Sequence, residues 1–343
     1  MKENKVAALR ISAALLTVAL VTLGIHAIRG GVSAAPDFEC RVEGQEVTVE
    51  IPSGASGSQV AKILFEKGVT KSTDAYFRTA VANPKSTRVA PGAHLLTVKN
   101  CAKEVLAQLL DSARISGLIN ISEGAWNSEI VDQMVLVGFK RSEVMAAISS
   151  AQLPTGIKGT EGVLFPAQYS FAKGTTAVDA ISQMVDRGKS ELGKSGILAA
   201  TGKYTPQKLL IMASIIQAEA DTKDFPKVSQ VIRNRLEKGI PLQMDSTVHY
   251  IKKSRGKMFL STASTFLKSP FNTYRNYGLP PGAIGNPGAL AMSAAINPTL
   301  GNWLYFITVA PGDTRFTADI SEFNNWKVLY KQNLKSGLFR SKK

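Results

Sequence analysis

A strongly apolar helix that ends in one acidic residue is the feature that most constrains this chain. Thr205-Pro206 predicts the start of the helix, because threonine is a good N-cap and proline suits the first helical position. Four residues of this helix share one face at three-four-three spacing: Leu209, Met212, Ile216 and Glu219. We therefore expect the carboxyl group of Glu219 to lie on the apolar face of the helix.

A carboxyl group in that position has a chemical consequence. Removal from water disfavours the charged form, so burial raises the pKa of a carboxyl group. A glutamate that stays protonated near neutral pH can donate a proton, as the catalytic acids of glycosidases do. The alternative is a glutamate near a helix end whose side chain reaches water. The helix alone does not separate these interpretations.

The charge balance narrows the classes of partner. The chain has 343 residues, 44% hydrophobic residues and a formal net charge of +15, so it can form two or three globular domains. Its charge suits an anionic partner such as nucleic acid, a membrane surface or an acidic cell-wall polymer. The basic residues are scattered, however, and no zinc-binding spacing, Walker motif or aromatic-basic motif occurs. We therefore expect no nucleic-acid partner.

An apolar segment near the N-terminus indicates the compartment. Residues 11–28 contain no acidic or basic side chain except His26. As a helix, eighteen residues span about 27 Å, which is close to the thickness of a bilayer core. Three basic residues precede the segment: Lys2, Lys5 and Arg10. The pattern predicts a single transmembrane helix over residues 11–28.

The basic flank also predicts the orientation of that helix. Positive charge favours the cytoplasmic side, so residues 1–10 form a cytoplasmic tail and the rest of the chain is exported, in a single-pass protein of the cell membrane. Residues 29–46 are a spacer. The alternative is a cleaved signal peptide, because Val32-Ser33-Ala34 resembles a cleavage site. The apolar segment is long for a signal peptide, which favours the membrane helix.

The two cysteines, Cys40 and Cys101, could form a disulfide outside the cytoplasm. Such a bond would close a loop of about sixty residues and contribute on the order of 4 kcal/mol in the chain-entropy model. The alternative is a pair of free thiols. Two distant cysteines and three scattered histidines offer no metal site, and we expect no cofactor.

The exported part is predicted to be an α+β structure in two regions. Residues 47–112 show a strand over 47–51, helices near 60–67 and 73–82, a strand over 92–98 and a helix over 102–110. Residues 118–335 show a short strand near 119–124, helices over 131–148, 178–192 and 226–238, and a buried strand over 304–309. Between residues 239 and 301, abundant Pro, Gly and Asn predict an irregular segment. Disordered segments contain few aromatic residues, so the aromatic residues here indicate an ordered segment. Aromatic side chains beside polar ones suit a sugar-binding groove.

A set of motifs over residues 160–325 resembles the YceG-like family of endolytic murein transglycosylases. In chain order the motifs are Glu161-Gly162-Val163-Leu164-Phe165-Pro166 with Tyr169, Ala213-Ser214-Ile215-Ile216 with Glu219, Asn234-Arg235-Leu236, Leu242-Gln243-Met244-Asp245-Ser246-Thr247-Val248 with Tyr250, Ser269-Pro270-Phe271-Asn272-Thr273-Tyr274, Gly278-Leu279-Pro280-Pro281-Gly282, Asn286-Pro287-Gly288 and Tyr305-Phe306. Residues 47–112 resemble the LysM-like βααβ subdomain that precedes the catalytic region in this family.

The resemblance implies that Glu219 is the catalytic acid and base. The family often has a second glutamate two residues earlier, where this chain has Gln217. Phe323 stands where a histidine is common, so no role for that histidine carries over. Met244, Ser246 and Ala283 are further departures from the family pattern.

The same motifs imply contacts with the sugar from Gln243, Asn272 and Tyr274, each of which could instead fix a loop. Asp245 would orient substrate, stabilise positive charge or cap a turn. Glu161 would line the cleft or cap the segment after Gly162. For Arg235 we expect a structural ion pair rather than substrate binding.

Three functions follow from the resemblance. The first is lytic cleavage of the β-1,4 bond between N-acetylmuramic acid and N-acetylglucosamine in nascent peptidoglycan, which forms 1,6-anhydro ends and terminates strand elongation. The second is a hydrolytic muramidase on the same scaffold. The third is a non-catalytic scaffold that binds peptidoglycan in the cell-wall synthesis machinery. Glycan strands are the expected partner in each case, and peptidoglycan synthases are a family-level expectation.

Overall fold

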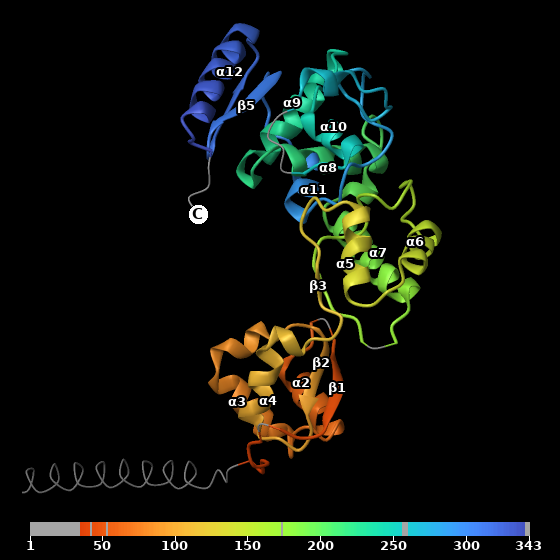
Figure 1. Cartoon of the computed structure of the whole chain (residues 1–343), viewed down its shortest axis with the longest axis vertical. Coiled ribbons are helices and arrows are strands. Elements are labelled where there is room, and N and C mark those ends of the chain that lie inside the picture. The colour runs from red at the N-terminus through yellow and green to blue at the C-terminus, as the bar shows by residue number, and fades with distance from the viewer. Residues whose placement is uncertain (1–34, 42, 53, 173, 256–259, 340–343) are drawn as a thin grey trace, which may run out of the picture. The chain divides into compact units, whose positions relative to one another are not determined.

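The computed structural model describes residues 35–41, 43–52, 54–172, 174–255 and 260–339. The chain forms two compact units, the first ending at Ser116 and the second beginning at Gly117 (Figure 1). Both mix helices with small sheets, so the expected α+β class is confirmed. The predicted membrane helix over residues 11–28 lies outside the described residues. Among the described residues, no helix has the length and hydropathy needed to cross a bilayer.

The N-terminal unit contains the predicted order of strand, helix, helix, strand and helix. Its elements are β1 (Glu46–Ile51), α2 (Gly57–Glu66), α3 (Thr73–Ala82), η1 (Pro84–Arg88), β2 (Gly92–Thr97), α4 (Ala102–Leu110) and η2 (Ser112–Arg114). The two strands pair antiparallel, from Glu46 opposite Thr97 to Ile51 opposite Gly92. The three helices and the sheet enclose a separate apolar core that includes Leu64, Leu96 and Val105.

Local sequence signals place the ends of these helices. Ser56 and Gln59 form a capping box at the start of α2, and Ser72 caps α3 through the amide of Ala75. At α4 the cap comes from far along the chain, because the carboxylate of Asp37 accepts the amide hydrogen of Ala102. A disulfide joins Cys40 to Cys101 beside this contact. The segment before β1 is thereby fixed to the start of α4.

The second unit carries most of the helices (Figure 1). Its elements are β3 (Ile119–Asn120), α5 (Asn127–Leu136), α6 (Arg141–Ser150), β4 (Gln168–Tyr169), α7 (Ala177–Lys194), η3 (Ile197–Ala199), α8 (Pro206–Glu219), η4 (Thr222–Asp224), α9 (Phe225–Glu237), α10 (Asp245–Lys252), η5 (Thr262–Phe266), α11 (Ala289–Ile296), β5 (Tyr305–Ala310), β6 (Asp313–Thr317) and α12 (Ile320–Lys335). Strands β3 and β4 pair antiparallel, as do β5 and β6.

Helix α8 is the centre of this unit. Thr205 caps it and Pro206 opens it, as predicted. The expected single apolar face is wrong, however, because every residue from Leu209 to Ile216 is buried. Helices α9, α10 and α11 pack around it, so no side of its middle meets water. The first and last turns are less buried, and Glu219 is the final residue of the helix.

The prediction of an irregular segment over residues 239–301 is wrong in part. Helices α10 and α11 and the short helix η5 lie within it. Helix α11 is alanine-rich and follows Gly288, and four of its eight residues are buried: Ala291, Met292, Ala294 and Ala295. The flanking Pro and Gly residues suggested loops, but burial against α8 stabilises these short helices, as tertiary packing commonly does.

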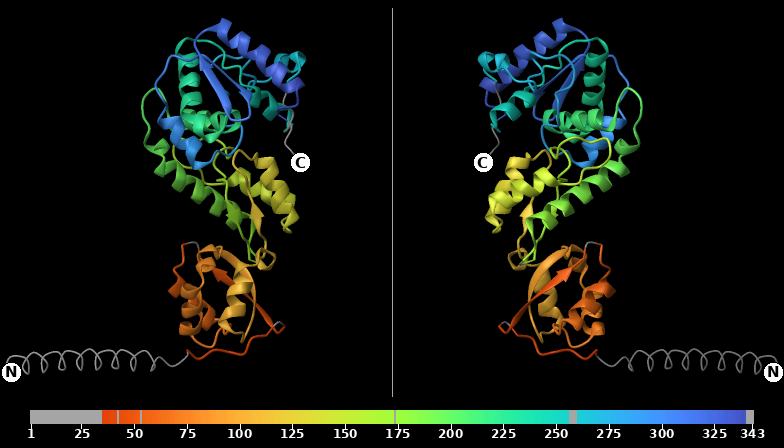
Figure 2. Two further views of the ribbon diagram at one scale, coloured as in Figure 1. Left: turned by 90° about the vertical axis from the view of Figure 1, so that its left-hand side faces the viewer. Right: turned by 90° about the vertical axis from the view of Figure 1, so that its right-hand side faces the viewer.

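The C-terminal hairpin differs from its prediction in burial. Strand β5 was expected to be buried, yet Val309 is its one buried residue. Helix α12 packs along the hairpin in both views of Figure 2 and has no buried residue. The hairpin is held to α9 by Asn234, whose side-chain amide donates to the carbonyl oxygens of Gly301 and Trp303 at 2.9 and 2.8 Å. The hairpin and α12 are therefore less buried than the rest of the unit.

The disulfide generates a prediction about stability. Replacing Cys40 and Cys101 together by serine should lower the unfolding free energy of the N-terminal unit by up to about 4 kcal/mol, because the bond closes a loop of 61 residues in the unfolded chain. Denaturant unfolding of the full chain, followed by hydrogen exchange in residues 46–110, measures this. An unchanged stability in that unit would contradict the prediction.

Candidate active site

The second unit contains a cleft of about 1060 Å³ at the C-terminal end of α8. Its walls come from α8, α10, the β5–β6 hairpin, α12 and the loop before α5. Four of the six residues predicted for the site line it: Glu219, Gln243, Asp245 and Tyr274. They belong to segments that are 24 to 55 residues apart in sequence (219 to 243, and 219 to 274). Folding therefore brings the main candidates together.

Glu219 is partly exposed to the cleft and otherwise surrounded by protein. Its Oε1 atom accepts the amide hydrogen of Ser246 at 3.0 Å. Ser246 is the second residue of α10, so the carboxyl group sits at the positive end of that helix. Burial raises the pKa of Glu219 to about 7, the charge of Asp245 adds to this rise, and hydrogen bonding from Ser246 opposes it. The group can therefore exchange a proton near neutral pH.

Asp245 is held beside this acid by a tyrosine. The hydroxyl group of Tyr274 donates a hydrogen bond to the Asp245 carboxylate. Burial raises the pKa of Tyr274, and the hydrogen bond to Asp245 raises it further, so the tyrosine remains a donor. Asp245 is also the first residue of α10, where a negative charge is favourable. The site thus presents one protonatable carboxyl group next to a fixed negative charge.

Gln217 does not supply a second acid. It lines the cleft two residues before Glu219, but it is an amide. Its Oε1 atom accepts the amide hydrogen of Gly288 at 2.9 Å, just before α11. The residue therefore joins α8 to the start of α11.

Gln243 adopts an unusual backbone conformation. Its φ of 53° lies in the left-handed region, which non-glycine residues seldom occupy. Two contacts hold it there: its amide hydrogen bonds to the carbonyl oxygen of Thr273 at 3.0 Å, and its Oε1 accepts from Arg235 at 2.9 Å. Strained residues of this kind cluster at functional sites. Its position at the cleft fits the predicted contact with substrate.

Arg235 corrects a prediction. Among the described residues it makes no ion pair. Its buried guanidinium instead donates to the carbonyl oxygens of Pro241 at 3.0 Å and Leu304 at 2.8 Å, as well as to Gln243. Pro241 lies in the loop before α10 and Leu304 directly precedes β5, so the carbonyl groups of both segments lie within reach of Arg235 on α9. Arg235 therefore fixes two walls of the cleft in relation to each other.

Asn272 has the loop-fixing role that was its alternative. The residue is fully buried and does not line the cleft. Its amide group donates to the carbonyl oxygens of Thr265 and Leu267, and its Oδ1 accepts the amide hydrogen of Tyr274. All of these partners are backbone groups, so the side chain shapes the loop that presents Tyr274.

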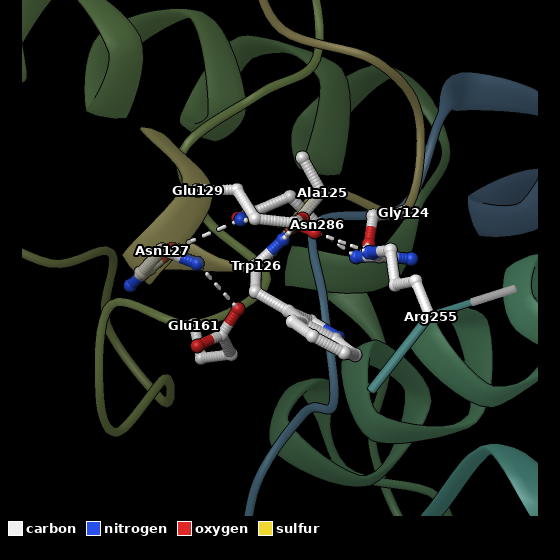
Figure 3. Close-up of polar contacts among 8 residues, drawn as sticks. All are labelled: Gly124, Ala125, Trp126, Asn127, Glu129, Glu161, Arg255 and Asn286. Atoms are coloured by element: carbon white, nitrogen blue, oxygen red, sulfur yellow. Dashed lines mark hydrogen bonds and ion pairs between the residues drawn. The ribbon is translucent and has the colours of Figure 1, made fainter. Parts of the chain in front are cut away.

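Glu161 lies outside the cleft lining as well. One of its oxygens accepts the amide hydrogen of Asn127 at 3.0 Å (Figure 3). The other accepts the hydroxyl hydrogen of Tyr250 at 3.2 Å. Because Asn127 is the first residue of α5, Glu161 caps that helix rather than the segment after Gly162. Burial raises its pKa, and the Asn127 bond opposes the rise.

A cationic and aromatic cluster, which the sequence did not reveal, fixes one rim of the cleft. Figure 3 shows Arg255 beside Trp126, with its guanidinium carbon 4.0 Å from the centre of the indole ring. The Nη2 atom of Arg255 donates to Glu129 at 2.8 Å and to the carbonyl oxygen of Gly124 at 2.6 Å. Both Trp126 and Arg255 line the cleft. Arg255 therefore holds this rim together through its contacts with Gly124, Trp126 and Glu129.

Asn286 also holds this rim through its side-chain amide. Its side-chain amide donates to the carbonyl oxygen of Ala125 at 2.8 Å and to Oδ1 of Asn127 at 2.9 Å (Figure 3). Its Oδ1 accepts the amide hydrogen of Gly162 at 3.0 Å. The asparagine of the Asn286-Pro287-Gly288 motif thus connects three segments of the unit.

Helix α12 forms another wall of the cleft, and sequence reasoning missed it. The side chains that line the cleft from this helix are Ile320, Phe323, Asn324, Lys327, Tyr330 and Lys331. Their spacing of three and four residues was visible in the sequence and places them on one helix face. Phe323 also stacks on Tyr305 of β5, with ring centres 5.1 Å apart.

Comparison with known proteins gives a consistent result. The profile of the YceG-like family matches residues 49–328. An endolytic murein transglycosylase of Bacillus subtilis is 31% identical over 308 residues, which cover 83% of this chain and 84% of that protein. An endolytic murein transglycosylase of Streptococcus pneumoniae is 32% identical over 179 residues, half of this chain and 30% of that protein.

A solved structure agrees with the sequence relatives. The crystal structure of a YceG-like protein from Listeria monocytogenes has a TM-score of 0.56 and 28% identity, and the match covers 82% of this chain and 98% of that one. The family profile extends over most of both units. This chain belongs to the YceG-like family.

Proposed function

We propose that this chain is a lytic transglycosylase that cleaves the glycan strands of peptidoglycan. The observation that carries the proposal is Glu219, a carboxyl group with a pKa of about 7 at the wall of a cleft of about 1060 Å³. The Bacillus subtilis relative, which matches most of the chain, is named for the same reaction. The proposed bond is the β-1,4 linkage between N-acetylmuramic acid and N-acetylglucosamine.

In the first step Glu219 acts as an acid. Its protonated carboxyl group donates to the glycosidic oxygen while the bond from that oxygen to C1 of the muramic acid breaks. Positive charge develops on the sugar ring as the bond lengthens. The carboxylate of Asp245, held by Tyr274 beside Glu219, lies where it can stabilise that charge. The departing N-acetylglucosamine takes the proton as its new hydroxyl group.

In the second step the same residue acts as a base. The Glu219 carboxylate removes the proton from the C6 hydroxyl group of the muramic acid, and O6 forms a bond to C1. The product is a 1,6-anhydro ring, and Glu219 is protonated again. An internal hydroxyl group replaces water as the nucleophile, because it is already positioned near the reacting carbon. One carboxyl group is therefore sufficient for both proton transfers.

Hydrolysis by a muramidase is the second candidate, and Asp245 is the observation that favours it. Glycosidases that use water usually need two carboxyl groups. Asp245 is close enough to Glu219 for its charge to raise the pKa of Glu219. Its bond from Tyr274 favours a fixed electrostatic role instead. The chemical form of the product ends separates the two reactions.

We also propose that the reaction takes place at the outer surface of the cell membrane. The apolar segment over residues 11–28 and its basic flank would hold the enzyme at the membrane, with the cleft on the outer side. Strands that are still being made lie near that surface. We propose that cleavage there limits strand length, and that peptidoglycan synthases are the neighbours of the enzyme.

The first prediction concerns the acid itself. Glu219→Gln should lower the release of muropeptides from purified peptidoglycan by at least about 10²-fold, because the amide cannot transfer the proton. Mass spectrometry of products from the wild type should find 1,6-anhydro ends. Glu322→Gln is a matched control, since Glu322 is exposed on α12 and does not line the cleft. Activity that survives in Glu219→Gln would refute the assignment, and reducing ends would indicate the muramidase.

The second prediction concerns stability. The folded pKa of Glu219 is about 7 and its ordinary value is 4.5, so ionisation is less favourable in the folded chain. The stabilising effect of the protonated group is complete below about pH 4.5 and is lost as the pH rises through 7. Glu219→Gln should therefore stabilise the second unit by roughly 2 to 3 kcal/mol at pH 8 and by little at pH 4.5. Urea unfolding at several pH values tests this, and a difference that is constant with pH would contradict it.

The third prediction concerns the amide hydrogen that Ser246 donates to Glu219. Ser246→Pro removes this donor in the first turn of α10, where proline is tolerated. Loss of the bond destabilises the carboxylate, so the pKa of Glu219 rises and the alkaline limb of kcat/KM moves up by about one pH unit. Ser246→Ala keeps the backbone donor and should move the limb less. Equal displacements in the two variants would show that the backbone bond does not tune the acid.

A further inference from the structure

The cleft-facing side of α12 is not packed against any core. The side chains from Ile320 to Lys331 that line the cleft occupy one face of the helix over three turns. None of the residues of α12 is buried, although the face carries aromatic and aliphatic side chains. Helix α12 packs against the β5–β6 hairpin, and Phe323 of the cleft-facing side stacks on Tyr305 of β5. The cleft-facing side is therefore a wall that is open to a ligand.

Two lysines give this wall a positive charge. Lys327 and Lys331 are exposed and lie four residues apart, a spacing at which like charges destabilise a helix. Within the part of the chain that the structure describes, neither lysine forms an ion pair with a carboxylate. Locally unfavourable arrangements tend to occur where function requires them. An anionic ligand in the cleft would supply the missing counter-charge.

The wall lies close to the reacting groups. Burial raises the pKa of Tyr330, and the charge of Asp245 contributes to the rise, so the middle of α12 is within electrostatic range of α10. Lys327 is also ordered, because its Nζ atom lies 5.6 Å from the ring centre of Phe323, which stacks on Tyr305. A strand whose scissile bond is at Glu219 would therefore pass along the two lysines.

We propose that Lys327 and Lys331 form a subsite for the carboxylates of the peptide stems that the glycan carries. This inference rests on the proposed function. The sugar backbone of a peptide-bearing strand is uncharged, because the lactyl carboxyl group of its muramic acid is bound in an amide with the peptide. The negative charge of such a strand therefore lies in its stems. The lysines would attract that charge, whereas the carboxylates of Glu219 and Asp245 would repel it.

The test compares three substrates. The first is intact strands, the second is the same strands with their carboxylates converted to amides, and the third is strands freed of peptide, which expose the lactyl carboxylate. Changing both Lys327 and Lys331 to Gln should raise KM on intact strands by about 3- to 20-fold, with kcat within about 2-fold, as expected for two exposed ion pairs. The increase should disappear on amidated strands and on strands without peptide.

Matched variants separate charge from structure. Lys335→Gln changes a lysine on the same helix that does not line the cleft, and it should leave KM unaltered. Changing Lys327 and Lys331 to Arg keeps the charge and should restore binding of intact strands. The KM difference should also shrink at high salt, because exposed ion pairs are screened.

Each contrary result has a distinct meaning. An equal increase in KM on amidated strands would overturn charge recognition by these lysines. An increase that persists on strands without peptide would assign them to the lactyl carboxylate and overturn the stem subsite. If the wild type cleaves none of the three substrates, the proposed function itself is wrong.

Discussion

The structure of the second unit depends on the burial of α8 along almost its whole length. Every residue from Leu209 to Ile216 is enclosed by neighbouring helices, so the position of the last turn is fixed by packing rather than by local contacts. That packing delivers Glu219 to the cleft in an environment that disfavours its charged form. The amide hydrogen of Ser246 limits the effect, because it stabilises the carboxylate. The pKa of about 7 reflects this opposition between burial and hydrogen bonding from Ser246.

The walls of the cleft are positioned by polar contacts between segments distant in sequence. Arg235 reaches both the loop before α10 and the first strand of the hairpin through carbonyl oxygens. Asn286 holds the opposite rim. Most of their hydrogen bonds involve backbone groups, and each side chain also has one side-chain partner: Gln243 for Arg235 and Asn127 for Asn286.

The sequence predicted the parts of the structure that local chemistry determines. The capping threonine and proline located α8, and helical spacing located α7 and α9. Failures occurred where tertiary contacts decide the outcome. Helix α11 is stabilised by burial of four of its residues, although Pro and Gly flank it. Asn272 and Glu161 looked like ligand contacts, yet their partners are a loop and the start of α5, which no spacing in the sequence indicates.

The charged groups of the cleft suit a mechanism in which Glu219 transfers a proton in both steps. The carboxylate of Asp245 accepts a hydrogen bond from Tyr274 and can stabilise a cationic sugar. Burial raises the pKa of Glu219 to about 7, and the charge of Asp245 contributes to that rise. A substrate carboxylate that approached these groups would be repelled by the negative charge of Asp245. Lysines on α12 would attract such a carboxylate, so recognition of the stems and proton transfer use different residues of one cleft.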